Sequence, residues 1–435
     1  MQSLHQLLER LSDGSCDARL TELYAPNADS AALDAARQRA IGAAQGFQTA
    51  FSPDGSAPAA LFSGPGRTEI GGNHTDHQHG HVLCGSVDLD TLACAGPNGL
   101  NVVRIHSEGY APLEISLDQL EAVPAEKNTS AALVRGVAAG FAQRGKTVGG
   151  FDAYVTSNVL SGSGLSSSAA YEVLVGNIFN HLFCEDSFTP MELAQIGQMA
   201  ENVYFGKPCG LMDQAASAVG SAVAIDFKDP AAPVVRRIDF DFDHCGYALC
   251  IVDTGSCHAD LTDDYASIPQ EMCAVAAHFG KTVLRDVDRS EVLEAIPSLR
   301  VRCGDRAVLR ALHFFHDDLR AAQEADALAA GNFQRFLDLV NQSGRSSAEL
   351  LQNVIAGNDP REQAVALALA MAQEALEGQG AVRVHGGGFA GTIQAFVPVE
   401  RLEHFRSVME GVLGLGKCHV LRIRPVGGCV VFAND

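Results

Sequence analysis

The sequence contains no tryptophan, and aromatic residues make up only 6% of its 435 residues. It also lacks any block rich in lysine and arginine, and its formal net charge is −21. A strongly acidic chain without a basic patch does not attract nucleic acid or an anionic membrane surface. We therefore expect neither as a partner. No run of 18 apolar residues is present, so no membrane-spanning helix is expected.

Two further absences concern the compartment. The first twenty residues lack a basic flank followed by an apolar run, which is the pattern of a secretory signal peptide. The twelve cysteines are scattered through the chain without a CxxC pair. Cysteines of this kind, in a long chain without a signal peptide, are expected to be reduced thiols. These features predict a cytoplasmic protein.

What is present indicates a large folded chain. Hydrophobic residues make up 47% of the sequence, which is enough for a substantial core. The length allows two or three domains. Helical periodicity covers residues 1–50, and short strand-like runs then alternate with helical stretches up to the end of the chain. The strand-like runs occur in clusters, without regular βαβ alternation, which favours an α+β fold.

Residues 71–81, GGNHTDHQHGH, concentrate four histidines and one aspartate. These residues are His74, Asp76, His77, His79 and His81. Such a stretch can form a metal site, a polar wall that binds a ligand, or a set of structural histidines. On one strand, His77, His79 and His81 would share a face, which is compatible with metal binding. The stretch alone does not decide between these possibilities.

Three glycine-containing stretches carry further signals. SGSGLSSSA, at 161–169, has small residues that allow close approach of a ligand, and its serines precede a helix whose free N–H groups can cradle phosphate. It does not match the Walker A pattern, and a simple N-capped loop is the alternative. AENVYFGKPCGLMDQ, at 200–214, contains Glu201 and Asp213, which could equally be a surface acid and a helix-start acid. HGGGFAGT, at 385–392, permits either a tight turn or close ligand approach.

Taken together, GPGRTEIGGNHTDHQHG, VLSGSGLSSSAAYEV, PCGLMDQ and VHGGGFAGT resemble, in this order, the motifs of the GHMP small-molecule kinases. The first is similar to the galactokinase signature, whose usual form is close to GRVNLIGEHTDYNGG. The resemblance covers about residues 60–435. It implies a two-lobed α+β fold with mixed and antiparallel sheets and an active site in the cleft between the lobes. We expect a helical extension (1–50), an N-terminal lobe (51–215, joined by 417–435) and a C-terminal lobe (216–416).

The resemblance also implies an activity, namely phosphoryl transfer from ATP, with Mg²⁺, to the anomeric hydroxyl of galactose. The partners would be the sugar and ATP, and the protein would be a monomer or a weak dimer. The implied catalytic residues are Asp213 and Arg67, and the implied sugar-binding residues are Asn73, His74, Asp76, Gly210 and Tyr265. The implied phosphate-binding residues are Ser161, Gly162, Ser163, Gly164, Leu165, Ser166, Ser167 and Ser168. Ser167, Ser168 and Glu201 would hold the metal, and Gly386, Gly387 and Gly388 form the third glycine motif.

Departures from the family pattern fall on the sugar side. Asn73 replaces the usual glutamate before His-Thr-Asp, and His77 replaces the usual tyrosine. Loss of that carboxylate would reduce repulsion of a sugar acid, so a galacturonate kinase is an alternative. A catalytically inactive sugar sensor is another, although such regulators lose part of the Ser/Ala segment that this chain retains. Galactose is favoured because the rest of the signature follows galactokinases and residues 67–81 offer no second basic residue for a uronate.

Overall fold

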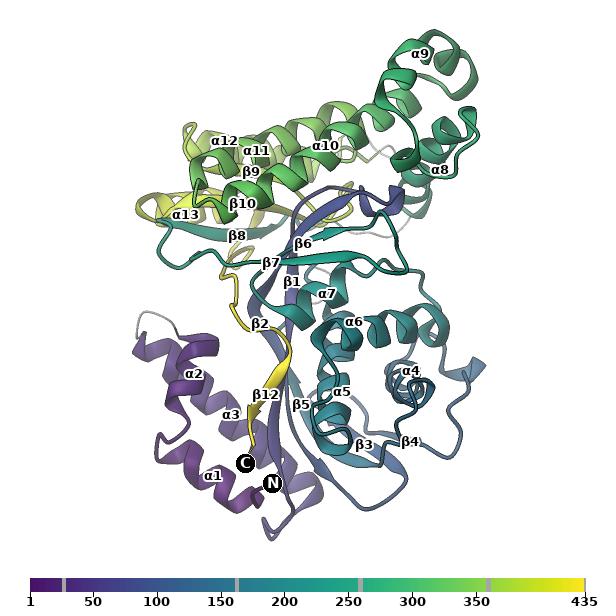
Figure 1. Cartoon of the computed structure of the whole chain (residues 1–435). Coiled ribbons are helices and arrows are strands. Elements are labelled where there is room, and N and C mark those ends of the chain that lie inside the picture. The colour runs from purple at the N-terminus through teal and green to yellow at the C-terminus, as the bar shows by residue number, and fades with distance from the viewer. Residues whose placement is uncertain (26–28, 161–163, 257–260, 357–360, 434–435) are drawn as a thin grey trace.

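The structure, a computed structural model, describes residues 1–25, 29–160, 164–256, 261–356 and 361–433. Its elements fall into a lower and an upper lobe, each built around one sheet (Figure 1). Ser161, Gly162 and Ser163, which were predicted to bind phosphate, lie outside the described residues.

The larger sheet forms the lower lobe. Its strands are β1 (Ala60–Gly71), β2 (His81–Pro97), β3 (Val102–Ser107), β4 (Leu113–Ser116), β5 (Phe151–Ser157), β6 (Ala222–Asp226), β7 (Val234–Ile238) and β12 (Cys429–Phe432). They follow the order β12-β1-β2-β5-β3-β4, while β6 pairs with β2 and β7 with β6. β3 and β5 run parallel, and the other described pairs in this sheet are antiparallel.

The smaller sheet is antiparallel and belongs to the upper lobe. Its order is β11-β8-β10-β9. The strands are β8 (Tyr247–Asp253), β9 (Ala381–His385), β10 (Thr392–Pro398) and β11 (Cys418–Leu421). Mostly antiparallel sheets with helices in contiguous runs confirm the predicted α+β class.

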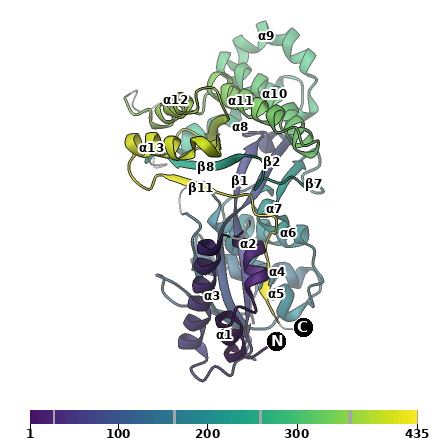
Figure 2. The ribbon, with the colours of Figure 1, turned by 90° about the vertical axis from the view of Figure 1, so that its left-hand side faces the viewer.

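Helices of the lower lobe cover both faces of its sheet. They are α1 (Leu4–Ser12), α2 (Asp17–Tyr24), α3 (Ser30–Phe51), η3 (Pro124–Glu126), α4 (Ser130–Gln143), α5 (Ser167–Phe183), α6 (Pro190–Met199), the π-helical η4 (Ala200–Phe205) and α7 (Met212–Val219). α1–α3 lie on one face of the sheet, and α4–α6 lie on the other (Figures 1 and 2). The short η2 (Asp76–Gln78) connects β1 and β2.

Helices of the upper lobe pack on and beside the smaller sheet (Figure 1). They are α8 (Thr262–His278), η5 (Leu284–Asp286), α9 (Arg289–Cys303), α10 (Asp305–Ala329), α11 (Phe333–Ser346), the π-helical η6 (Ser347–Leu351), α12 (Ala364–Leu376), η7 (Val399–Arg401) and α13 (Leu402–Leu413). In the described segments, no helix is long and apolar enough to cross a membrane.

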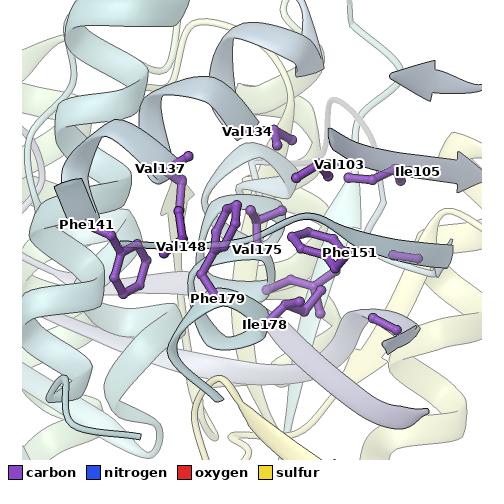
Figure 3. Close-up of a cluster of buried hydrophobic side chains, with 14 of the residues drawn as sticks. Val103, Ile105, Val134, Val137, Phe141, Val148, Phe151, Val175, Ile178 and Phe179 are labelled. Atoms are coloured by element: carbon purple, nitrogen blue, oxygen red, sulfur yellow. The ribbon is translucent and has the colours of Figure 1, made fainter. Parts of the chain in front are cut away.

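An apolar core fixes α4 and α5 against the larger sheet (Figure 3). Phe151 of β5 and Phe179 of α5 are buried, with ring centroids 5.1 Å apart in an edge-to-face arrangement. Val137 and Phe141 of α4 belong to the same cluster. Each such side chain contributes about 1.5–3 kcal/mol when it is fully buried. The core therefore holds α5 rigidly, and α5 begins at the serines of the second motif.

The strand memberships differ from the lobe boundaries predicted from the sequence. β6 and β7 follow residue 215 yet belong to the larger sheet, and β11 follows residue 417 yet belongs to the smaller one. β6 and β7 join the larger sheet because the first residues of β2, 81–85, extend beyond β5 and pair with β6. β11 pairs with β8 of the smaller sheet. β12 joins the larger sheet beside β1.

A buried carboxylate ties the N-terminal helices to the sheet. Asp90 of β2 is completely buried and forms ion pairs with Arg39 of α3 and Arg424, and Tyr24 Oη donates a 2.6 Å hydrogen bond to it. The backbone N–H of Asp90 donates to Asn158 Oδ1 at 2.7 Å. Because Asn158 precedes the 161–169 loop, α3 is connected to the base of that loop.

Replacing Arg39 with leucine should therefore destabilise the whole lower lobe. Removing one partner of a buried ion pair costs about 3–5 kcal/mol, and the remaining Arg424 places this variant at the lower end of that range. The control is Arg37→Leu on the same helix, because Arg37 pairs with the more exposed Asp17 and such pairs contribute about 0–1 kcal/mol. Urea unfolding of both variants measures the difference. Equal effects would contradict a specific role for Arg39.

Candidate active site

The two residues predicted to be catalytic are in direct contact. Asp213 lies in the first turn of α7 and Arg67 lies in β1. Arg67 Nε donates to Asp213 Oδ1 at 2.6 Å, and the Ser166 hydroxyl donates to Oδ2. Another guanidinium nitrogen of Arg67 donates to the carbonyl of Gly164. One arginine thus joins the carboxylate to the end of the glycine loop.

These contacts decide the charge of Asp213. Burial acts to raise its pKa, but the positive charge of Arg67 and the hydrogen bonds from Arg67 and Ser166 outweigh burial and lower the pKa below its ordinary value. Asp213 is therefore an ionised carboxylate at neutral pH. An ionised carboxylate held on both oxygens is suited to accept a proton from a bound hydroxyl.

Residues 164–166 of the 161–169 loop lead into the N-terminus of α5. Gly164 (φ +73°) and Ser166 (φ 54°) have left-handed backbone conformations, and the helix begins at Ser167. Leu165 is buried, and its carbonyl accepts from the backbone N–H of Arg67 at 3.0 Å. Leu165 therefore anchors the loop. The free N–H groups and the positive dipole end at Ser167 are available to an anion.

A hydroxyl and a carboxylate meet one residue further along α5. Ser168 Oγ donates to Glu201 Oε1 at 3.1 Å, and Lys207 Nζ lies 3.4 Å from the same oxygen. Glu201 is 1% exposed and belongs to η4, a wider π-helical turn at the end of α6. Mg²⁺ prefers oxygen ligands and retains several waters, so Ser168 and Glu201 fit this ion. Ser167 instead lines a neighbouring cavity.

That cavity was not predicted from the sequence. It has a volume of about 620 Å³ and lies beside the N-terminus of α5. Its lining includes Thr91, Tyr110, Val155, Val159, Ser167 and Tyr171. The Tyr110 side chain is 80% exposed, so an aromatic face is open to a ligand. Val159, Ser167 and Tyr171 belong to the second motif, whereas Thr91, Tyr110 and Val155 come from strands and loops that no motif marked and that only the fold brings together.

His74 and Asp76, from the 71–81 stretch, each contact a residue of another motif. His74 has a left-handed backbone (φ 60°), and its Nε2 donates to the carbonyl of Gly387 at 3.0 Å. Burial and the nearby His77 lower the pKa of His74 to about 4, so the ring is neutral and Nδ1 is left as an acceptor. Asp76 begins η2, and a Cβ on Gly210 would lie only 3.0 Å from its Oδ2. The structure thus brings Asp76 and Gly210 together.

The third glycine motif supports this loop from the upper lobe. Tyr265, in the first turn of α8, donates from Oη to the carbonyl of Gly388 at 2.7 Å. Gly388 (φ +79°) and Gly386 (φ +66°) have conformations that favour glycine, and a Cβ on Gly387 would lie 2.7 Å from the Tyr265 ring. The glycines therefore allow the turn to pass between Tyr265 and His74.

Asn73 does not face a ligand, which corrects the prediction that it contacts the sugar. It is completely buried, and both parts of its amide are bonded within the protein. Nδ2 donates to Glu69 Oε1 at 2.9 Å and to the carbonyl of Gly386 at 2.7 Å. Oδ1 accepts from Asn353 at 2.8 Å and from Ser347 at 3.2 Å. An amide with all four hydrogen bonds satisfied has none left for a substrate.

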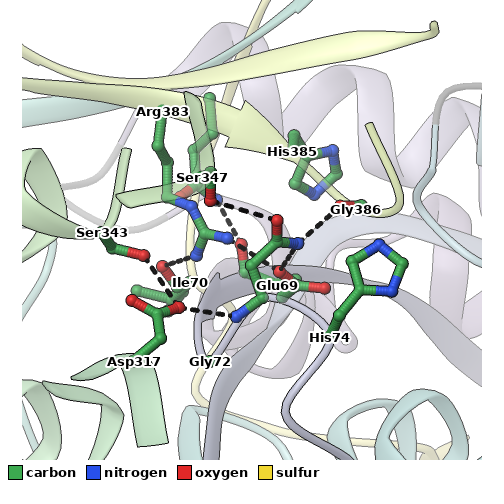
Figure 4. A network of polar contacts seen from close by, with 12 residues as sticks. Glu69, Ile70, Gly72, His74, Asp317, Ser343, Ser347, Arg383, His385 and Gly386 are labelled. Atoms are coloured by element: carbon green, nitrogen blue, oxygen red, sulfur yellow. Dashed lines mark hydrogen bonds and ion pairs between the residues drawn. The ribbon is translucent and has the colours of Figure 1, made fainter. Parts of the chain in front are cut away.

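The network around Asn73 joins the two lobes (Figure 4). Glu69 of β1 pairs with Arg383 of β9 at 2.9 Å, and Arg383 also donates to the carbonyl of Ile70. Asp317 of α10 accepts from the backbone N–H of Asn73 at 2.9 Å. Burial raises the pKa of Glu69, and the charge of Arg383 only partly offsets this effect.

The three alternating histidines do not share a strand face, so the spacing that suggested metal binding is not realised. His77 lies in η2, His79 follows it in a left-handed conformation, and His81 begins β2. His81 lies 3.2 Å from Asp226 and 2.9 Å from Asp318. Within the described ranges, no group of three or more His, Cys, Asp or Glu side chains is placed to hold a metal ion.

Two further residues near Glu201, namely Gln214 and Glu172, were not predicted from the sequence to belong to the site. Gln214 Nε2 donates to both Glu201 Oε2 and Glu172 Oε2, at 2.9 Å each. Burial, and then the nearby Glu201, raise the pKa of Glu172 well above its ordinary value. The signal was available in part, since Glu172 is four residues after Ser168 and interrupts an apolar helix face.

The chain is similar to known kinases in sequence and in fold. Residues 132–221 match the GHMP kinases N terminal domain, and residues 45–97 match the galactokinase galactose-binding signature. The crystal structure of Lactococcus lactis galactokinase complexed with galactose is 25% identical, with a TM-score of 0.73 over 88% of this chain and 97% of that one.

More distant kinases share the fold. L. major mevalonate kinase in complex with R-mevalonate is 13% identical, with a TM-score of 0.57 over 86% of this chain and 97% of that one. Streptococcus pneumoniae phosphomevalonate kinase in complex with phosphomevalonate and AMPPNP is 13% identical, with a TM-score of 0.57 over 83% of this chain and 99% of that one. The chain therefore carries a GHMP kinases N terminal domain and a galactokinase galactose-binding signature in its lower lobe, on a fold similar to that of the galactokinase structure.

Proposed function

We propose that the protein is an ATP-dependent sugar kinase that phosphorylates the anomeric hydroxyl of galactose to give galactose 1-phosphate. The observation that carries this proposal is the position of Asp213. Its carboxylate is ionised, is held on both oxygens, and is bonded to Ser166 at the start of α5. A sugar hydroxyl bound at Asp213 would lie beside the helix end that attracts the phosphates.

The chemistry follows from these positions. In phosphoryl transfer the nucleophile must be oriented in line and must lose its proton, and charge develops on the phosphoryl oxygens. Asp213 would orient the sugar hydroxyl and accept its proton, while Arg67 would stabilise the developing negative charge. A carboxylate with a lowered pKa is a weak base, so we expect the proton to move late, when the hydroxyl oxygen is already bonding to phosphorus.

The α5 N-terminus and the cavity beside it would bind ATP. The free N–H groups at Ser167 suit the phosphates, and the open Tyr110 ring in the cavity of about 620 Å³ suits a purine base. Ser168 and Glu201 would hold Mg²⁺. When bound, this ion would neutralise phosphate charge.

The loop that carries His74 and Asp76 favours a neutral sugar over a uronate. His74 offers an acceptor nitrogen, and Asp76 offers two acceptor oxygens, which suit hydroxyl donors and repel a carboxylate. Arg67 is paired with Asp213, and Arg383 is paired with Glu69. Near this loop, neither arginine is available to neutralise a second carboxylate. Galactose fits this set of groups better than galacturonate does.

Incubation of the full chain with ATP, Mg²⁺ and a sugar panel tests the proposal. Galactose should stimulate ADP release well above glucose and galacturonate, and ³¹P NMR should show an anomeric phosphate. Efficient turnover of galacturonate with little turnover of galactose would overturn the choice of sugar. Calorimetric binding of galactose without turnover would identify a sugar sensor instead of a kinase.

A further inference from the structure

A pair of buried carboxylates behind the phosphate end of α5 shares one amide group. Glu172 of α5 and Glu201 of η4 are each 1% exposed, and Gln214 of α7 is completely buried. The single NH₂ group of Gln214 donates to an oxygen of each carboxylate at 2.9 Å. Three elements therefore meet at one side chain, directly after Asp213.

The two oxygens of Glu201 have different surroundings. Oε1 is contacted by Ser168 at 3.1 Å and Lys207 at 3.4 Å, on the side of the proposed metal site. Oε2 is contacted by Gln214 from the interior. Contacts on both oxygens fix the plane of the carboxylate, so the direction of Oε1 depends on the bond that Oε2 makes.

Glu172 in turn fixes Gln214. Its Oε2 accepts the second N–H of Gln214, and α6 packs directly against both residues, since a Cβ on Gly197 would lie 3.1 Å from Glu172 Oε2 and 3.2 Å from Gln214 Cγ. Glu172 Oε1 and Gln214 Oε1 are buried without a hydrogen-bond partner among the described residues. Unpaired buried oxygens are costly, so a purely structural core has no need of this pair.

We infer that Gln214 and Glu172 are positioning residues for Glu201, and that they set the affinity of the site for a divalent cation. This inference rests on the proposed function, because it takes Glu201 as a metal ligand. Gln214 would orient Glu201, and Glu172 would hold the Gln214 amide in the required rotamer. Partners that orient a ligand in this way commonly change metal affinity by about 10–100-fold when they are removed.

The test measures cation binding directly, without turnover. Mn²⁺ binding in the presence of AMP-PNP is followed by electron paramagnetic resonance for the wild type, Gln214→Met and Glu172→Leu. Gln214→Met should weaken Mn²⁺ binding by about 10–100-fold. Glu172→Leu should weaken it less, and Glu172→Gln, which keeps an acceptor oxygen of the same reach, should recover most of that loss. Glu201→Gln gives the loss expected when the ligand itself is changed.

Gln198→Met is the matched control. Gln198 donates to the carbonyl of Cys209 at 3.3 Å, in the same region, and should leave Mn²⁺ affinity unchanged. Galactose binding, measured by calorimetry, should also stay within a factor of about three in all variants that retain the wild-type melting temperature. Unchanged Mn²⁺ affinity in the Gln214 and Glu172 variants would overturn the inference, as would an equal loss in Gln198→Met. Failure to phosphorylate galactose would contradict the proposed function only, because this measurement needs no transfer.

Discussion

Asp213→Asn is expected to lower kcat by about 10²–10⁴-fold, which is the usual contribution of a general base. Asparagine keeps the shape of the side chain and an oxygen for Arg67 Nε, but it cannot accept the proton of the sugar hydroxyl. The KM for ATP should change little, because Asp213 contacts the loop through Ser166 and has no direct bond to the Ser168–Glu201 pair. Steady-state ADP release at varied ATP concentration, with galactose saturating, measures kcat and the KM for ATP separately.

Two further variants, Asp305→Asn and Arg67→Met, test whether the loss of activity is specific to the Asp213 carboxylate. Asp305→Asn removes an acid from the first turn of α10, which matches the position of Asp213 in α7, but Asp305 is exposed and pairs with Arg300. Its activity should remain that of the wild type. Arg67→Met should also reduce kcat strongly, since it removes the positive charge beside the reacting oxygen. If Asp213→Asn kept most of its activity while Arg67→Met lost it, the site would act by electrostatic stabilisation alone.

Much of this site could be predicted from short motifs, because some contacts join motif residues to one another. Asp213, Arg67 and Ser166 belong to separate motifs and meet in the structure. The same holds for His74 and the third glycine motif. Glycine positions were informative because their backbone conformations and close approaches tolerate few other residues.

The role of a residue could not be predicted where its hydrogen-bond partners lie outside the motifs. Asn73 was expected to face the sugar, but its amide oxygen is bonded by Asn353 and Ser347 of the upper lobe, which no motif marks. The prediction that His77, His79 and His81 share a strand face was wrong for a local reason. η2 and the left-handed His79 interrupt the strand that would have aligned them. The cavity beside α5 and the Gln214 bridge depend on the packing of several elements, which periodicity does not specify.

The second large effect concerns stability. The usual motif has glutamate at the position of Asn73, which would suggest that Asn73→Glu is harmless, but the structure predicts the opposite. The new carboxylate would lie against Glu69, whose Oε1 is 2.9 Å from Asn73 Nδ2, and near the carbonyl of Gly386. Asn353 and Ser347 can still donate to one oxygen of the new carboxylate, but its other oxygen would face two acceptors, and this second buried acid should cost about 3–5 kcal/mol. Urea unfolding should show this loss.

The exchange of the two residues provides the decisive comparison. The family signature has asparagine where this chain has Glu69 and glutamate where it has Asn73, so the network contains the same two groups in reversed positions. The double variant Glu69→Asn/Asn73→Glu again places one carboxylate and one amide beside Arg383. It should be more stable than Asn73→Glu alone, with a coupling energy of about 1–3 kcal/mol in the double-mutant cycle. Additive losses would mean that Glu69 and Asn73 are not coupled, and a fully stable Asn73→Glu would mean that the site at position 73 is open to solvent or to substrate.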